Sequence, residues 1–474
     1  MDRALALSCL FLLLSPAAAA QEVSEVGRLQ VLPGYVMRAP TVVWDGARYL
    51  VFFESYPDQQ PGETDLYLAR IAPDGTLETG DVRPLGLGGA TLPGSPRAAF
   101  NPTSGRTLLA WVAKDGVLSD IAATTLDFDG APSAVIALTQ TAAVELRPTV
   151  AANAYGFLVG WAAGVPNGGS VVSGRRLTAE GQLIDPAPVS IREASTAFEN
   201  RPFVLGTEHG YLFLWDEADA DVDGFITTVT SSAAFRAGPV LRLAAGAERQ
   251  SGLTAAPLGP RFYAVWQDFR RGDLPDAWGV RLQADLQLDR VPEIVTQVDG
   301  RTNEPVIAGD ADGALVVWQS LRTGRTRGEI RAGRIDTAGR ILEYPGFEVI
   351  SVDENVYEHA VAKGPDDQYL VVAIEDTVLP RIVYALVESG LSAVEEPPPD
   401  AGVPEDDAGT PPRDSGSRDA APVDAGVADA GMQAASDAGF PAPGASDEGC
   451  QSTPGTPGAL VLVGLWALIR RRRG

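Results

Sequence analysis

A short acidic segment is the residue pattern most suggestive of ligand chemistry. Asp219, Asp221 and Asp223 stand on alternate positions before Gly224, which permits a sharp turn. Oxygens spaced in this way can converge on Ca²⁺, because calcium takes several carboxylate and carbonyl ligands. Threonines stand where a later acidic ligand would be needed, so such a site requires water or another loop. The sequence leaves open a calcium site and an unoccupied acidic turn.

A second group of charged residues is the candidate ligand-binding set. Its members are Glu54, Asp216, Glu217, Asp268, Arg270, Arg322 and Glu375. Two carboxylates can hydrolyse a glycosidic bond, and Asp216 and Asp268 are the first candidates for that role. A solvated rim of mixed charge is the alternative. Apart from Ca²⁺, no cofactor is expected.

Nucleophilic and transition-metal chemistry find little support in the sequence. His209 and His359 are the two histidines, and neither has metal-ligand spacing or an evident nucleophile beside it. The two cysteines, Cys9 and Cys450, lie near the ends of the chain, where they cannot staple a central domain. We therefore expect no triad-type catalytic residue, and the sequence favours a non-enzymatic role.

A repeat carries the charged residues of the central region. Segments of about 50 residues recur seven times between Arg38 and Gly390, and each places a large apolar residue late in its second strand pattern. This column reads Phe53, Trp111, Trp161, Trp215, Trp266, Trp318 and Ile374. Repeats of this length with four short strand patterns are typical of β-propeller blades. The sequence predicts an all-β, seven-bladed β-propeller over residues 21–394.

The ends of the repeat region predict how the ring closes. The seventh copy supplies only three strands, whereas residues 26–32 match the fourth-strand pattern seen at 237–243. Pairing 26–32 with 382–387 would complete the last blade and leave no open edge between blades. Six or eight blades remain as alternatives, should one copy be miscounted.

The connections between strands predict which face binds a ligand. Those between second and third strands are long and differ between copies, as at 54–64, 216–224, 267–277 and 319–328. Variable connections on a rigid frame are where binding usually resides. We expect them to share one face with the connections between blades, and we expect His209 on the opposite face.

Composition limits the partners. The formal net charge of -25 argues against nucleic acid, whose phosphates such a surface repels. A divalent cation or a cationic partner is more compatible with this charge.

The ends of the chain predict export. Residues 1–20 combine Arg3 with an apolar run and an alanine-rich cleavage region, which is typical of a secretory signal peptide. Residues 395–448 are rich in Pro, Ala and Asp and predict a disordered, solvated stalk. Residues 449–474 contain Gly449-Cys450, a hydrophobic helix pattern at 458–469 and an Arg cluster.

This last segment resembles the myxobacterial C-terminal sorting signal. The resemblance implies that a sorting protease processes the chain at Cys450 and that lipid is attached there. The protein would then be held at the cell surface in the outer membrane. An ordinary C-terminal transmembrane anchor with an incidental cysteine is the alternative, although the apolar run is short for a stable span.

Two further columns resemble those of bacterial secreted propellers. An acid precedes the third strand as Asp65, Asp120, Asp223, Asp276 and Glu329, and an arginine lies within it as Arg70, Arg176, Arg281 and Arg334. Thr125 replaces the arginine in the second copy. Recurrence in many blades favours a structural task over catalysis. The 219–224 segment, in turn, is similar to the calcium loops of integrin-type propellers.

These observations predict a surface-anchored binding or interaction module for a protein or a polysaccharide. A carbohydrate-active hydrolase that uses the long-loop carboxylates and a purely structural surface spacer are the alternatives.

Overall fold

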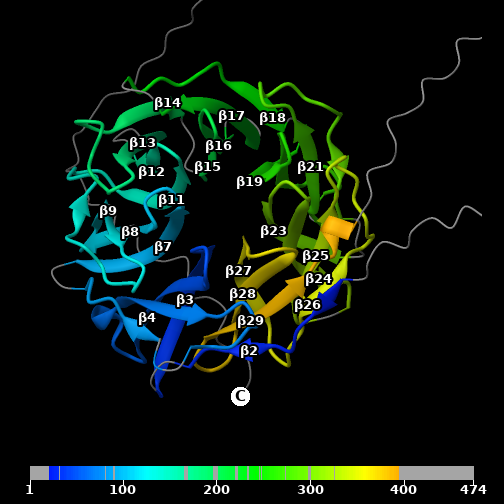
Figure 1. Cartoon of the computed structure of the whole chain (residues 1–474), viewed down its shortest axis with the longest axis horizontal. Helices are drawn as coiled ribbons and strands as arrows, with labels where there is room; N and C mark the ends of the chain where they lie inside the picture. Colours follow the sequence, from blue (N-terminus) through cyan, green and yellow to red (C-terminus); the bar gives the residue numbers. More distant parts are fainter. Residues whose placement is uncertain are drawn as a thin grey trace, which may run out of the picture. The chain divides into compact units, whose positions relative to one another are not determined.

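The computed structural model describes residues 21–393, apart from 31–32, 79, 81, 89–90, 165–168, 196–200, 219–221, 232–233, 245, 247, 273, 297–299 and 325. Within these residues the chain forms seven antiparallel sheets arranged in a ring (Figure 1). The predicted seven-bladed β-propeller is therefore confirmed. The expected signal peptide, the stalk and the C-terminal segment with Cys450 lie outside the described residues.

The strands of each blade follow sequence order from the inside of the ring outward (Figure 1), except that the N-terminal chain supplies the outermost strand of the seventh blade. The inner strands of blades 1 to 7 are β3 (Tyr35–Trp44), β7 (Leu92–Asn101), β11 (Glu145–Asn153), β15 (Phe203–Thr207), β19 (Gln250–Leu258), β23 (Gly300–Gly309) and β27 (Val356–Lys363). The second strands are β4 (Tyr49–Pro57), β8 (Arg106–Asp115), β12 (Gly156–Gly164), β16 (Gly210–Ala218), β20 (Arg261–Asp268), β24 (Ala314–Arg322) and β28 (Gln368–Glu375).

The outer half of each blade is less regular. The third strands are β5 (Asp65–Ile71), β9 (Leu118–Leu126), β13 (Ser170–Thr178), β17 (Val222–Thr230), β21 (Asp276–Leu282), β25 (Glu329–Ile335) and β29 (Arg381–Glu388). The fourth strands of blades 1 to 6 are β6 (Arg83–Pro84), β10 (Ile136–Ala137), β14 (Val189–Ser195), β18 (Leu241–Ala244), β22 (Glu293–Ile294) and β26 (Phe347–Ile350). Glycines with positive φ, such as Gly75 at 80° and Gly130 at 75°, make the predicted hairpins before the fourth strands.

The N-terminal chain completes blade 7, as the sequence predicted. β2 (Gly27–Arg28) pairs with β29 through Gly27 opposite Tyr384, and the amide of Leu29 donates to the carbonyl of Ile382 at 2.9 Å. A shorter strand that the sequence did not reveal, β1 (Glu22–Val23), pairs with the far end of β29. The last blade therefore has its fourth strand, and its outer edge is covered.

The second strands form the core because each lies between two neighbouring blades. In the predicted column from Phe53 to Ile374, no side chain is more than 1 % exposed. A strand buried on both faces loses the alternation of apolar and polar residues, which explains the continuous apolar runs in the sequence. Gly346 illustrates how tight this core is: a Cβ atom there would lie 2.3 Å from the Trp318 ring.

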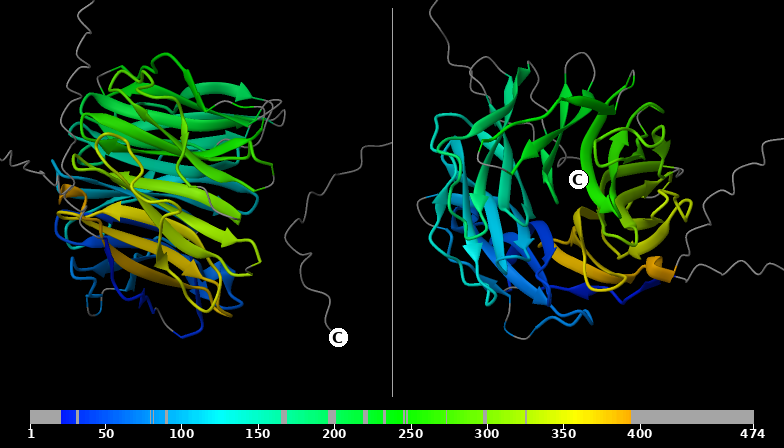
Figure 2. Two further views of the ribbon diagram at one scale, coloured as in Figure 1. Left: turned by 90° about the vertical axis from the view of Figure 1, so that its right-hand side faces the viewer. Right: turned by 45° about the horizontal axis from the view of Figure 1, so that its top comes forward.

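The ring has two faces, which we name by their connections (Figure 2). The long-loop face carries the second-to-third and inter-blade connections, and the short-turn face carries the others. Much of the sequence expected to be long loop is strand, because β4 continues to Pro57 and β24 to Arg322. In blade 2, Gly116 and Val117 alone connect β8 to β9. These connections therefore run from two residues in blade 2 to seven in blade 1, and they are shorter than the sequence suggested.

Helical structure among the described residues consists of the 3₁₀ turns η1 (Pro61–Glu63) and η2 (Leu391–Ala393). Neither approaches the length and apolarity of a membrane-crossing helix, and none of the described segments does.

The recurring arginine of the third strand connects neighbouring blades on the short-turn face. Arg176 forms an ion pair with Asp185 of its own blade at 2.6 Å and donates to the Thr230 carbonyl of the next blade at 3.0 Å. The arrangement recurs as Arg281 with Asp289 and Thr337, and as Arg334 with Glu343 and Ser389. We call this the Arg connector. Its contacts agree with the structural role expected from its recurrence.

The recurring acid has a similar local task. The carboxylate of Asp65 accepts backbone amides from Gly86, Leu87 and Gly88, at 2.9 to 3.0 Å, and so holds the chain as it leaves β6. Asp120 accepts the amide of Thr141 at 2.9 Å in the corresponding place of blade 2. Such bonds fix the start of the third strand and leave little freedom for ligand chemistry.

Candidate functional site

A bulge interrupts the inner strands at their long-loop end. The register of β3 shifts between Arg38 and Thr41, and the same two-residue irregularity recurs in blades 2, 3, 5, 6 and 7. One residue of each bulge has positive φ, as Ser95 does at 52° and Arg147 at 56°. Bulges redirect side chains out of the pleat, and here they do so around the axis of the ring.

We call the residues at these positions the bulge ring. They are Ala39, Ser95, Arg147, Arg201, Gly252, Glu304 and Glu358, with Arg201 assigned by its place before β15. Positive charge thus comes from blades 3 and 4 and negative charge from blades 6 and 7. The non-glycine residues with positive φ carry backbone strain, which often marks a functional position.

Charged side chains of the bulge ring approach one another from different blades. Nη1 of Arg201 lies 3.9 Å from Oε1 of Glu304, and the two side chains are 34 % and 57 % exposed. Gly252 of the intervening blade lies beside this nitrogen, since a Cβ atom there would make an ordinary van der Waals contact with it at 3.9 Å. The pair is long, exposed and therefore weak, so either partner can exchange it for a ligand group at little cost.

Arg97 lies directly beyond the bulge of blade 2 and adds a further charge. The surrounding protein desolvates its guanidinium and lowers the pKa, and the carboxylates of Glu358, Glu304 and Glu54 oppose that effect. Arg97 nevertheless keeps contact with solvent. Carboxylates from three blades therefore act on this one arginine.

Glu54 and Asp216, both predicted ligand-binding residues, hold the bulges in place. Oε2 of Glu54 accepts the amide of Ser95 in the next blade at 3.1 Å. Asp216 accepts the amide of Arg201 at 2.6 Å and that of Gly252 at 2.9 Å, which joins blades 4 and 5. Burial raises the pKa of both carboxyl groups, and the backbone amides oppose the rise. Both oxygens of Asp216 and one oxygen of Glu54 are thus engaged by backbone amides.

Glu217 and Asp268 are also paired within the protein. Each accepts a hydrogen bond from the indole two residues earlier: Trp215 to Glu217 at 3.4 Å and Trp266 to Asp268 at 3.1 Å. Glu217 binds Arg192 at 2.8 Å, and Asp268 binds Arg270 at 2.6 Å.

Arg270, Arg322 and Glu375 complete the predicted set, and each has a partner. Arg270 lies over the Trp278 ring, 3.7 Å from its centroid. Arg322 contacts Glu329 at 3.2 Å. Glu375 binds Arg381 at 2.6 Å and Arg28 at 3.3 Å; burial raises its pKa, but these partners outweigh burial and leave the pKa lowered.

The predicted calcium segment is only partly described. Asp219 and Asp221 fall outside the described residues, whereas Asp223 is the second residue of β17 and pairs with Arg242. Within the part of the chain that the structure covers, no group of His, Cys, Asp or Glu is arranged to hold a metal ion.

The two histidines occupy separate places. His209 lies in the tight turn between β15 and β16 on the short-turn face, as expected. His359 follows Glu358 in β27 and is buried. Burial lowers its pKa, and the Glu304 carboxylate opposes the change.

The bulge ring was missed by sequence reasoning, although a signal for it exists. A proline follows the bulge residue in blades 1, 2, 3, 4 and 6, as in Arg201-Pro202 and Glu304-Pro305. Proline within a strand is confined to edges and bulges, so its recurrence in the first strand of the repeat indicates the irregularity.

Comparison with known proteins identifies solved structures with a similar fold but no related family. No protein-family model matches the sequence, and no curated protein matches it. A solved protein of unknown function from Dyadobacter fermentans has a TM-score of 0.51 at 11 % identity, over 78 % of this chain and 99 % of that one. The comparison shows the fold alone.

Two enzymes are similar over part of their length. A prolyl endopeptidase has a TM-score of 0.47 at 15 % identity, over 74 % of this chain and 46 % of its own. A Trypanosoma rangeli sialidase has a TM-score of 0.44 at 10 % identity, over 76 % and 54 %. This chain therefore spans about half the length of either enzyme, and neither likeness bears on its activity.

Proposed function

We propose that the propeller is a binding module whose protein or polysaccharide ligand contacts the bulge ring. The exposed, long Arg201–Glu304 pair supports this most directly, because it offers a cation and an anion that are weakly committed to each other. Arg97 and Arg147, both exposed, extend the positive side of the same ring. A ligand that presents polar groups of both kinds fits this arrangement.

The engagement of the deeper carboxylates weighs against the hydrolase alternative. Asp216 accepts two backbone amides and Asp268 is held by Trp266 and Arg270, so neither is a free acid or nucleophile. A glycosidase needs one carboxylic acid and one carboxylate that both face the scissile bond.

A binding screen tests the proposal. The full chain is assayed against a glycan array and secreted proteins of the same source, with and without Ca²⁺. We expect a ligand whose affinity falls at least about tenfold in Arg201→Ala and Glu304→Ala and weakens with salt, because exposed charges are screened. Arg290→Ala, which removes an exposed arginine outside the bulge ring, should leave the affinity unchanged.

The other outcomes decide between the alternatives. A complete lack of ligands would support the structural spacer. Release of sugar from a chromogenic glycoside, lost in Asp216→Asn and Asp268→Asn, would instead establish the hydrolase.

We also propose that the chain is exported and anchored at the cell surface through residues 449–474. This rests on the signal peptide pattern and the Gly449-Cys450 motif. Cys450→Ala should release the protein from the surface or leave it unprocessed, which surface proteolysis and fractionation would reveal. Unchanged surface display would overturn the role of Cys450.

A further inference from the structure

Side-chain connectors join the short turns of neighbouring blades. The Asn153 side chain donates to the carbonyl of Gly210 at 2.7 Å, linking blade 3 to blade 4. The Asn101 side chain likewise links blade 2 to blade 3, through the carbonyls of Asn153 at 2.8 Å and Gly156 at 3.4 Å. We call this the Asn connector. Blades 5 and 6 are linked by a backbone bond from Gly259 to Asp310 at 2.8 Å, and blades 6 and 7 by Lys363 with Asp310 at 2.9 Å.

Blade 4 lacks both kinds of connector toward blade 5. Thr207 pairs with Gly210 in the ladder as Asn153 pairs with Gly156, so it occupies the position of the Asn connector. Thr228 pairs with Leu212 as Arg176 pairs with Leu158, so it occupies the position of the Arg connector. In the described structure neither threonine side chain bonds to blade 5, because both are too short to cross the junction.

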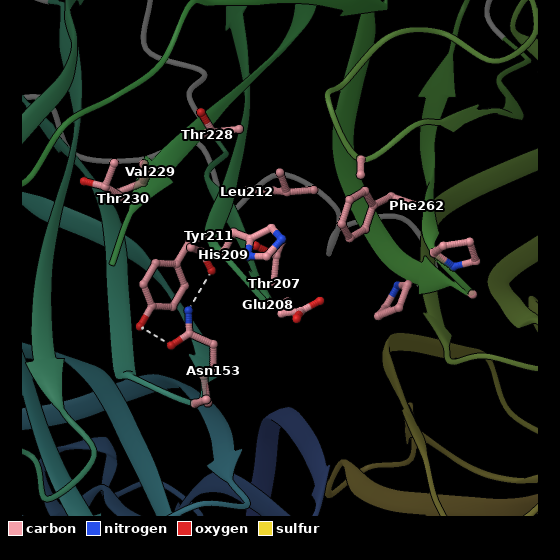
Figure 3. Close-up of a pocket in the computed structure, with 18 residues that line it drawn as sticks. Asn153, Thr207, Glu208, His209, Tyr211, Leu212, Thr228, Val229, Thr230 and Phe262 are labelled. Carbon is pink, nitrogen blue, oxygen red and sulfur yellow. Dashed lines mark hydrogen bonds between the residues drawn. The ribbon is translucent and has the colours of Figure 1, made fainter. Parts of the chain in front are cut away.

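A cavity opens where these connectors are missing. It has a volume of about 620 Å³ and lies between the short turns of blades 3, 4 and 5 (Figure 3). Thr207 and Thr228 both line it. Binding pockets for small molecules commonly span 300 to 1,000 Å³, so this space is of ligand size.

The walls of the cavity differ in character. Thr207, Glu208 and His209 of the β15–β16 turn supply polar groups, and Figure 3 shows them around the space that Phe262 also faces. Pro257 and Pro260 join Phe262 in an apolar wall from blade 5. None of the three polar side chains has a hydrogen-bond partner in the described structure, whereas the Asn153 amide is used by Gly210 and Tyr211.

We propose that this cavity binds a pyranose ring of a neutral glycan. A pyranose presents an apolar C–H face, which suits the Phe262 and proline wall, and a rim of hydroxyl groups. The carboxylate of Glu208, the His209 ring and the Thr207 hydroxyl can accept from and donate to those hydroxyls. The lining contains Glu208 and no lysine or arginine, which disfavours an anionic sugar.

The site is independent of the function proposed above, since the cavity lies on the short-turn face and the bulge ring on the long-loop face. Its existence depends on two substitutions within the repeat, Thr207 and Thr228. Other junctions have one of these connectors or a different bond in its place. Between blades 7 and 1, for example, the Tyr384 hydroxyl donates to the Gly75 carbonyl at 3.3 Å.

Saturation-transfer NMR on the full chain tests this site. The probes are the methyl glycosides of glucose, galactose, mannose, xylose and N-acetylglucosamine, with glucuronate and choline as charged controls. We expect at least one neutral glycoside to bind and both charged probes to fail. Phe262→Ala and Glu208→Ala should each weaken that binding at least about tenfold.

Matched variants make the result specific. Tyr155→Ala removes an aromatic ring, 59 % exposed, from the corresponding turn of blade 3 outside the cavity lining, and should leave binding unchanged. Arg201→Ala in the bulge ring should also have no effect. Glu208 is exposed, so Glu208→Ala remains informative if Phe262→Ala fails to fold. Binding of choline alone, binding of no neutral glycoside, or binding that survives both cavity variants would overturn the proposal.

Discussion

Two neighbouring junctions, one between blades 3 and 4 and one between blades 4 and 5, share the same backbone arrangement. They differ in the side chains that lie across them. At the first, Asn153 and Arg176 cross from blade 3 and bind carbonyls of blade 4. At the second, Thr207 and Thr228 occupy those positions and a cavity remains. The two junctions therefore differ at these two positions, and the junction with the shorter side chains borders the cavity.

The second junction is still held at its other end. Asp216 accepts amides from blades 4 and 5 on the long-loop face. The second junction therefore keeps a clamp on the long-loop face, and the following variants test how much each connection contributes.

Removing the Arg connector from the sealed junction should have the largest effect. Arg176→Met leaves the buried Asp185 without its cation and the Thr230 carbonyl without that donor, so we expect a loss of about 3 kcal/mol in the free energy of unfolding. Denaturant unfolding measures it. Arg242→Met removes an arginine that is 51 % exposed from its pair with the half-buried Asp223 and should cost less than about 1 kcal/mol. Equal losses would mean that the connector is no more than a surface ion pair.

Weakening the remaining clamp of the open junction should have an intermediate, pH-dependent effect. Asp216→Asn replaces one of two acceptor oxygens by a donor group, which we expect to cost about 1 to 2 kcal/mol. Because burial raises the folded-state pKa of Asp216, the folded protein holds this proton more tightly than the unfolded chain. The difference in the free energy of unfolding between the wild type and the variant should therefore shrink as pH rises from about 4 through the folded-state pKa of Asp216. If denaturant unfolding showed that this difference grows over that pH range, the raised pKa assigned to Asp216 would be contradicted.

Rebuilding a connector should have the smallest effect on stability and a clear effect on binding. Thr207→Asn places in blade 4 the residue that Asn153 supplies in blade 3, and one added hydrogen bond across the junction should contribute about 1 kcal/mol. The side chain also fills part of the cavity, so glycoside binding should be lost while the melting temperature rises. Thr207→Ser is the control and should keep both properties near wild type. Retained binding in Thr207→Asn would show that the missing connector is not what opens the site.

The sequence predicted the ring, but it did not reveal the partners of the charged residues. The Trp column and the hairpin glycines recur at fixed spacing, so blade number, strand order and closure by residues 26–32 could be inferred from local pattern. By contrast, Glu54, Asp216 and Asp268 looked like ligand-binding groups because they are charged and lie in connections. Glu54 and Asp216 bind amides that lie in the next blade or across a hairpin, and no local pattern identifies those partners. Asp268 instead binds Trp266 and Arg270, each two positions away, and only the structure shows that their side chains meet.

The sequence by itself determined that this chain builds a closed seven-bladed propeller, because burial of each second strand between two blades requires the same apolar run in every copy. Only the tertiary structure decided which polar groups are committed and which are available. Neighbouring blades bring together residues about 50 positions apart, so the reach of a single side chain across a junction settles whether that junction is sealed or holds a cavity.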